Sequence, residues 1–180
     1  MSDLNWRRLK YWRRLLSQAL DPAAAPGALE SMSEVLVEHG PHGVVQAWEL
    51  VSWLACRLGW RVQTSEVHPN VEIGWLCTAQ KRSVRLRIHR LADGPSDVRR
   101  VRLVCTIAGR PTALNLAAED GQRLAVSIEG TDTAPRTVTV QPQSRGDLLA
   151  RQLSDREHDP VFGESMAVAR LLARSTLGHH

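Results

Sequence analysis

Apolar side chains recur at spacings of three and four at the start of the chain, which is the period of one face of an α-helix. The residues that share this face are Trp6, Leu9, Trp12, Leu16 and Leu20. They predict a helix over residues 3–20, capped by Asp3, with Arg7 and Arg14 on its polar side. The stretch DPAAAPG, residues 21–27, begins a predicted linker over residues 21–30.

A second helical pattern lies in the stretch AWELVSWLACRLGW, residues 47–60. It predicts a helix over residues 44–58, which Gly59 can end. Two short segments that are typical of β-strands flank it, at Glu34–Glu38 and at Trp60–Thr64. Strand, helix and strand in this order predict a right-handed parallel crossover.

From about Gly74 onward, apolar and polar residues alternate one by one, which is the period of a half-buried β-strand. The clearest case is Ser83–Leu91, where Arg85 and Arg87 alternate with aliphatic residues. The same alternation recurs over residues 101–107, 112–116, 123–128 and 137–140. Because turn residues separate these segments, the pattern predicts an antiparallel meander.

Two further helices are predicted within residues 144–176. Ser144 and Asp147 resemble a capping box for the first, and Asp159 followed by Pro160 opens the second. His179 and His180 are consistent with the remnant of a purification tag. The elements predict one α+β domain over residues 1–180, with a mixed, mostly antiparallel sheet over residues 31–142, an N-terminal helix, one crossover helix and two C-terminal helices.

The composition narrows the classes of function. The chain has 180 residues, of which 43% are hydrophobic, and a formal net charge of +4. No apolar run reaches the ~20 residues of a membrane span, and the N-terminus lacks the apolar core of a signal peptide. We therefore expect a cytoplasmic protein that does not enter a membrane.

Basic residues on the predicted meander raise an alternative function. Its wet face would carry Arg85, Arg87, Arg100 and Arg102, enough for a basic module that binds nucleic acid or another polyanion. Acidic residues at the turns, and the lack of exposed aromatic residues on these strands, argue against nucleic acid.

Motifs for catalysis or cofactor binding are scarce. GESMA, residues 163–167, resembles a nucleophile elbow around Ser165, but its last glycine is replaced and it lies inside a predicted helix. His39 and His42 could offer two metal ligands, yet no third ligand stands at a suitable spacing. No glycine-rich nucleotide loop and no HExxH motif occurs. We predict that the protein is not an enzyme and has no cofactor-binding or metal site.

The three cysteines, Cys56, Cys77 and Cys105, form no CxxC motif and are typical of reduced thiols. Cys56 lies on the apolar flank of a predicted helix and Cys105 follows Val104 in a predicted strand. Both are therefore predicted as small buried hydrophobic residues. The position of Cys77 stays open.

Trp53 falls outside the apolar face of the helix over residues 44–58, on the side that also carries Glu49 and Arg57. Either another element of the chain covers this indole, or a partner protein does, since tryptophan often carries binding energy in interfaces. The candidate protein interface consists of Trp53, Glu49 and Arg57, together with Arg7 and Arg14 from the first helix.

Three phrases resemble one family in the same order along the chain. They are DLNWRRLKYWRRLLSQALDP (residues 3–22), WELVSWLACRLGW (48–60) and DLLARQLSDREHDPVFGESMAVARLL (147–172). Together they resemble the C-terminal domain of the OpcA family of glucose-6-phosphate dehydrogenase assembly proteins, in its cyanobacterial form. The resemblance implies a non-enzymatic accessory protein that binds the dehydrogenase oligomer and promotes its assembly or allosteric activation in the oxidative pentose phosphate pathway.

The sequence departs from the family in two respects. Family members usually carry a further N-terminal region, so we expect a fragment or a shortened version here. Cyanobacterial members link the effect to thioredoxin and cysteine oxidation, which implies redox control. None of Cys56, Cys77 and Cys105 matches a family redox pair.

Overall fold

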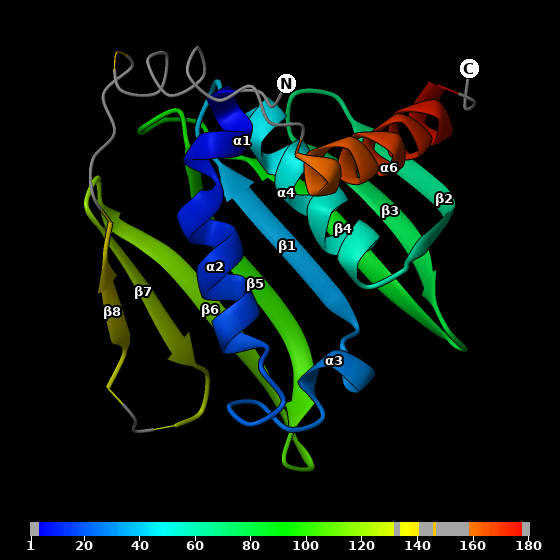
Figure 1. Cartoon of the computed structure of the whole chain (residues 1–180). Coiled ribbons are helices and arrows are strands. Elements are labelled where there is room, and N and C mark those ends of the chain that lie inside the picture. The colour runs from blue at the N-terminus through cyan, green and yellow to red at the C-terminus, as the bar shows by residue number, and fades with distance from the viewer. Residues whose placement is uncertain (1–3, 132–133, 141–145, 147–158, 178–180) are drawn as a thin grey trace.

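The structure is a computed structural model that describes residues 4–131, 134–140, 146 and 159–177. Its strands form one eight-stranded sheet, and the described helices pack against it (Figure 1). The helices are α1 (Leu4–Arg8), α2 (Lys10–Ala19), α3 (Ala28–Ser31), α4 (Val44–Arg57) and α6 (Pro160–Leu177). The strands are β1 (Glu34–His39), β2 (Arg61–His68), β3 (Glu72–Ala79), β4 (Arg82–Arg90), β5 (Val98–Ile107), β6 (Arg110–Asp120), β7 (Arg123–Ile128) and β8 (Arg136–Thr139).

The sheet confirms the predicted α+β class. Its strand order is β2-β3-β4-β1-β5-β6-β7-β8. β1 runs parallel to β4, and every other neighbouring pair is antiparallel. Because β2 and β4 both lie antiparallel to β3, β2 also runs parallel to β1. The crossover through α4 therefore joins two parallel strands, as predicted, with β3 and β4 between them.

The predicted uninterrupted meander is wrong at one point, because β1 lies between β4 and β5. Val35 of β1 is level with Leu86 of β4 and Leu103 of β5, and all three side chains are buried. Alternation along one strand says which face is buried but not which strand lies beside it. Among the described strands, β2, β3 and β4 form one antiparallel meander and β5, β6, β7 and β8 form another, with β1 between them.

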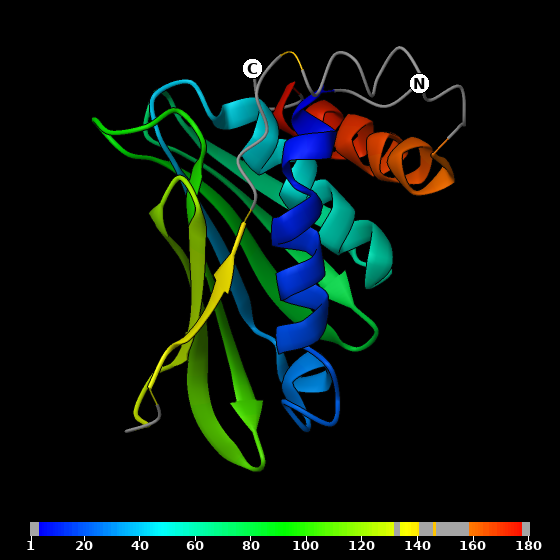
Figure 2. The same cartoon turned by 60° about the vertical axis from the view of Figure 1, so that its left-hand side comes forward.

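The described helices all lie on one face of the sheet, as the two views show (Figures 1 and 2). Trp75 of β3 joins the two layers. Its ring centroid lies 5.0 Å from that of Trp48 in α4, at an interplanar angle of 85°. Its indole N–H donates a hydrogen bond of 3.2 Å to the carbonyl of Leu172 in α6. This contact fixes α4 and α6 over the same half of the sheet.

The N-terminal segments confirm the predicted helix and differ from the predicted linker. α1 and α2 together cover the predicted range, with a turn at Leu9 between them. Most of the segment after α2 is exposed, but two of its residues anchor it to the core: Ala25 is 2% exposed and Ala28, which opens α3, is fully buried. The predicted cap at Asp3 and the predicted first C-terminal helix, with Ser144 and Asp147, lie outside the described residues.

The second C-terminal helix begins as predicted. Asp159 caps α6, since its Oδ1 accepts a hydrogen bond of 3.1 Å from the backbone N–H of Phe162. Its Oδ2 accepts a second bond, of 2.7 Å, from the indole N–H of Trp6 in α1. Burial raises the pKa of Asp159, but these bonds outweigh it and hold the pKa below its usual value. One carboxylate therefore both starts α6 and ties it to α1.

Replacing Asp159 by alanine should lower the free energy of unfolding by about 1–2 kcal/mol, because a helix cap and the bond to Trp6 are lost together. Urea unfolding measures the change. Asp159→Asn keeps a side-chain oxygen for the cap and should lose less. Unchanged stability of Asp159→Ala would show that α6 docks without this contact.

No described helix has the length and apolar character that crossing a bilayer requires.

Candidate protein-binding face

One face of the sheet carries no described helix (Figure 2). Charged side chains dominate this face. The strict alternation in β1 produces this face: Val35 and Val37 point toward the helices and are buried, while Glu34, Leu36 and Glu38 point the other way. The neighbouring strands follow the same register. We call this surface the charge-paired face and define it by Glu34, Leu36, Glu38, Glu72, Arg85, Arg87, His89, Arg100, Arg102 and Glu129.

Arg87 forms the centre of this face by binding carboxylates from two other strands. One terminal nitrogen lies 2.6 Å from Glu34 Oε1, and the other lies 3.2 Å from Glu72 Oε2. These contacts raise the pKa of Arg87, first through its hydrogen bond to Glu34. His89 Nδ1 lies 3.5 Å from Glu72, and Arg85 lies 3.9 Å from Glu34. The two carboxylates therefore each contact two cationic or titratable groups.

The other half of the face repeats this pairing. Arg100 lies 3.4 Å from Glu38. Arg102 makes a forked contact with Glu129, through bonds of 3.0 and 2.9 Å, and Asn115 donates a further bond of 2.9 Å to Glu129. The bonds from Arg102 and Asn115 lower the pKa of Glu129 to about 2. Glu129 is therefore ionised at neutral pH.

Along β1 the carboxylates lie beneath their guanidinium partners. Side chains of Glu34 and Glu38 are 19% and 18% exposed, whereas those of Arg85 and Arg100 are 64% and 55% exposed. A binding partner would first meet arginine hydrogen-bond donors, around the half-buried Leu36. Arginine is enriched in protein–protein interfaces because its planar head donates several bonds while its stem packs on apolar groups.

The ion pairs weigh against the alternative of a polyanion surface. Alternation along the strands predicts the arginines of this face but assigns no partners to Glu34, Glu38 and Glu72. Each of Arg85, Arg87, Arg100 and Arg102 contacts a carboxylate. Since the pairing neutralises much of the positive charge, a phosphate backbone would meet a weaker field than the arginines alone suggest.

The structure buries two of the five predicted interface residues. Trp53 is 8% exposed and Glu49 is 4% exposed. They share a side of α4 with Cys56, which contacts Ser165 of α6, while Glu49 acts electrostatically on Arg13 of α2. The N-terminal helices and α6 therefore flank this side of α4, and the chain itself covers Trp53.

The three predicted interface arginines lie at the surface. Arg57 and Arg14 are exposed and Arg7 is half-buried. Arg57 ends α4, and Arg14 lines a cavity between α2 and β8. The structure does not bring the five residues together into one exposed surface, and their role in an interface stays a prediction.

Of the residues considered for catalysis or metal binding, Ser165 and His39 are buried and bonded within the fold. Ser165 is fully buried inside α6 and donates a hydrogen bond of 2.7 Å to the carbonyl of Val161. His42 is exposed, but His39 is only 2% exposed and its Nδ1 lies 2.7 Å from the carbonyl of Gly40. Among the described residues, no three histidine, cysteine or acidic side chains are grouped as metal ligands.

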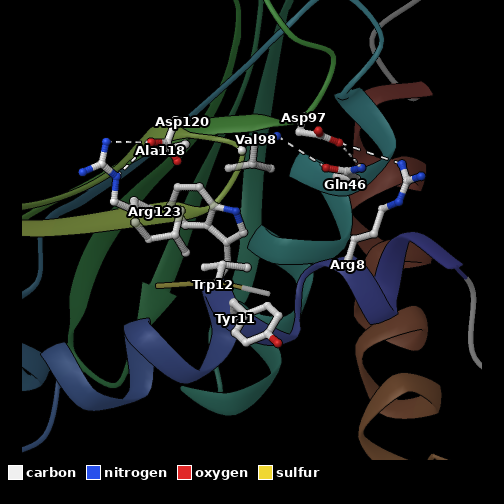
Figure 3. A pocket seen from close by; sticks show the side chains of 12 residues that line it. Arg8, Tyr11, Trp12, Gln46, Asp97, Val98, Ala118, Asp120 and Arg123 are labelled. Atoms are coloured by element: carbon white, nitrogen blue, oxygen red, sulfur yellow. Dashed lines mark hydrogen bonds and ion pairs between the residues drawn. The ribbon is translucent and has the colours of Figure 1, made fainter. Parts of the chain in front are cut away.

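A cavity of about 300 Å³ lies on the helical face, between α1, α2, α4 and the β6–β7 hairpin (Figure 3). At one end the buried Gln46 donates a bond of 2.9 Å to Asp97, which also lies 3.9 Å from Arg8. At the other end Arg123 pairs with Asp120 at 2.8 Å. Trp12 stands between these two pairs.

The sequence matches the model of a known protein family over most of its length. Residues 1–166 match the model of the family OpcA_G6PD_C, which is described as the C-terminal domain of a glucose-6-phosphate dehydrogenase subunit. The chain belongs to this family. The OpcA resemblance of the three sequence phrases is thereby confirmed.

Two cyanobacterial relatives carry the provisional name OxPP cycle protein OpcA. The one from Synechocystis sp. is 26% identical over an alignment of 183 positions, which covers 93% of this chain and 38% of the relative. The one from Nostoc punctiforme is 36% identical over 61 residues, which cover 34% of this chain and 13% of the relative. The match thus spans about two fifths of the length of the Synechocystis protein and a smaller share of the Nostoc protein. The family description and these names together associate the family with glucose-6-phosphate dehydrogenase and the OxPP cycle.

Among solved structures, a dehydrogenase (MviM) of Clostridium difficile has a similar fold. The TM-score is 0.52 at 9% sequence identity, and the match covers 98% of this chain and 61% of that chain. At this identity the likeness concerns the fold alone.

Proposed function

We propose that this OpcA-family domain is a non-enzymatic accessory domain that binds glucose-6-phosphate dehydrogenase. In this proposal it promotes the assembly or allosteric activation of the dehydrogenase in the oxidative pentose phosphate pathway. The charge-paired face is the docking surface.

The exposure and chemistry of the charge-paired face carry this proposal. It spans strands from β3 to β5 and reaches Glu129 at the end of β7, so it offers a broad surface on a rigid scaffold. Its outermost groups are arginine donors with aliphatic stems, which suit carboxylates and carbonyl oxygens of a protein partner. The family's association with the dehydrogenase supports the choice of partner.

Activation sets a thermodynamic condition on the complex. A domain that raises activity by shifting an equilibrium must bind the active form of the dehydrogenase more tightly than the inactive form. Each tenfold shift in that equilibrium requires about 1.4 kcal/mol of differential binding free energy. Tight binding alone would not activate the enzyme.

Size-exclusion chromatography with the dehydrogenase tests the proposal directly. We expect the domain to elute with the enzyme and to raise its activity, while the domain alone does not oxidise glucose 6-phosphate. If the folded domain neither elutes with the dehydrogenase nor changes its activity, the proposed partner is wrong. Oxidation of the substrate by the domain alone would contradict its non-enzymatic role.

Redox control through the cysteines stays a prediction of the family resemblance. Cys77 and Cys105 are buried, and burial raises the pKa of both thiols, that of Cys77 to about 11. Burial and then Glu164 raise the pKa of the half-buried Cys56. Since the thiolate is the reactive form, none of the three thiols is activated in this conformation.

The relative reactivity of the three thiols should therefore follow their solvent exposure rather than their pKa values. Iodoacetamide at mildly alkaline pH should alkylate Cys56 before Cys77 and Cys105, because Cys56 alone among them is only half-buried. Mass spectrometry of peptides over time measures the three rates. Faster modification of Cys77 would indicate that β3 opens in solution.

A further inference from the structure

A groove runs along α2, between this helix and the β7–β8 ribbon. Three cavities follow one another there, with volumes of about 300, 190 and 180 Å³. Tyr11 and Leu124 line both the first and the second, while Leu15, Gln18 and Arg136 line both the second and the third. Since neighbouring cavities share walls, they form one continuous groove, which we call the α2 groove.

The floor of the α2 groove is apolar. Leu124 of β7 pairs with Val138 of β8, so both side chains point to the helical face of the sheet, as does Val126. Val126, Ile128 and Val138 are only partly buried. Both views show the β7–β8 ribbon extending beyond α2 with no described helix over it (Figures 1 and 2). This part of the sheet offers the position that a further helix would occupy.

The rim of the α2 groove is basic. Arg14 of α2 and Arg136 of β8 stand on opposite sides of it, and both are exposed. Neither guanidinium group makes an ion pair or a hydrogen bond with any residue that the structure describes. The two acidic residues at its end are already bonded, Asp97 to Gln46 and Asp120 to Arg123. The free charges on the rim are therefore positive.

We propose that the α2 groove binds an acidic amphipathic helix from a partner protein. Apolar side chains at helical spacing would cover Val126 and Val138, and carboxylates on the flanks of that helix would pair with Arg14 and Arg136. The length of α2, 10 residues or about 15 Å, corresponds to nearly three turns of a ligand helix. This site lies on the opposite side of the sheet from the charge-paired face and does not rest on the dehydrogenase as partner.

A synthetic peptide provides the probe. It is about 14 residues long, with leucines at helical spacing and glutamates on both flanks. Fluorescence anisotropy of the labelled peptide should show saturable binding to the whole chain. In the double variant Arg14→Glu/Arg136→Glu, the Kd should rise at least about tenfold, because attraction on both sides of the groove becomes repulsion.

The matched control is Arg57→Glu/Arg110→Glu, which makes the same charge change at two exposed arginines outside the groove. It should leave the Kd within about twofold of the wild-type value. A peptide with lysines in place of the glutamates should not bind. The proposal is overturned if the peptide does not bind saturably, if both peptides bind equally, or if both double variants have the same effect. It is also overturned if two copies of the chain associate and bury the groove between them. Because the probe is a peptide and not the dehydrogenase, a negative result in this experiment does not test the proposed function. A failure of the domain to bind the dehydrogenase likewise does not test the α2 groove.

Discussion

Replacing Trp53 by alanine should destabilise the fold by about 3–5 kcal/mol, the range for truncating a large buried aromatic residue. Trp53 is 8% exposed and belongs to the main hydrophobic core, so its removal leaves a cavity between α4 and its neighbours. For a domain of this size the melting temperature should fall on the order of 10 °C. Differential scanning calorimetry measures this directly.

Two further variants separate the core role of Trp53 from an interface role. Trp53→Phe fills part of the cavity and should lose clearly less stability. Arg57→Ala changes an exposed residue one turn away and should leave the melting temperature nearly unchanged. If the Trp53→Ala protein melts like the wild type but no longer binds the dehydrogenase, Trp53 is an interface residue and not a core residue.

The burial of Trp53 shows what helical periodicity can and cannot predict. The helix over residues 44–58 was predicted closely, because its apolar period is regular and Gly59, at φ 64°, ends it. For its polar side the sequence left open whether another element of the chain or a partner protein covers it, and Gln46 and Glu49 are buried there by the chain itself. Periodicity identifies the side that packs on the sheet. It does not reveal that other helices cover the opposite side.

Gln46 shows how a polar side chain is accommodated on the side of α4 that faces away from the sheet. Its amide donates to Asp97 and its oxygen accepts from the backbone N–H of Val98, at 2.9 and 3.4 Å. Buried polar groups need such partners. The partners lie about fifty positions away in the sequence, at the start of β5, so no local pattern could have assigned them.

The order of the strands in the sheet likewise could not be predicted from local patterns. Period-two alternation located the strands, and turn residues separated them, because both signals are local. The insertion of β1 between β4 and β5 depends on how residues far apart pack together. That insertion also brings Glu34 and Glu38 beside Arg85 and Arg100. The sequence therefore predicted the arginines of the charge-paired face without the carboxylates beneath them.

The charge-paired face leads to the second large expected effect. The double variant Arg85→Glu/Arg100→Glu should weaken binding of the dehydrogenase at least tenfold, or about 1.4 kcal/mol. At a fixed concentration of the domain, activation of the dehydrogenase should fall as the bound fraction falls. Both arginines are the outermost groups of the face, and each reversal adds a carboxylate beside Glu34 or Glu38. A surface rich in donors then becomes one that repels carboxylates of the partner.

Stability should change little in this variant, because exposed ion pairs contribute only ~0–1 kcal/mol each. Circular dichroism and the melting temperature can confirm the fold before binding is measured by titration calorimetry. Arg57→Glu/Arg110→Glu, with the same charge change away from the charge-paired face, should bind normally. If that control loses binding instead, the dehydrogenase docks on the helical side, where Arg57 lies. If both variants bind and activate like the wild type, the charge-paired face is not the docking surface, because reversal of its most exposed charges cannot be neutral in a contact.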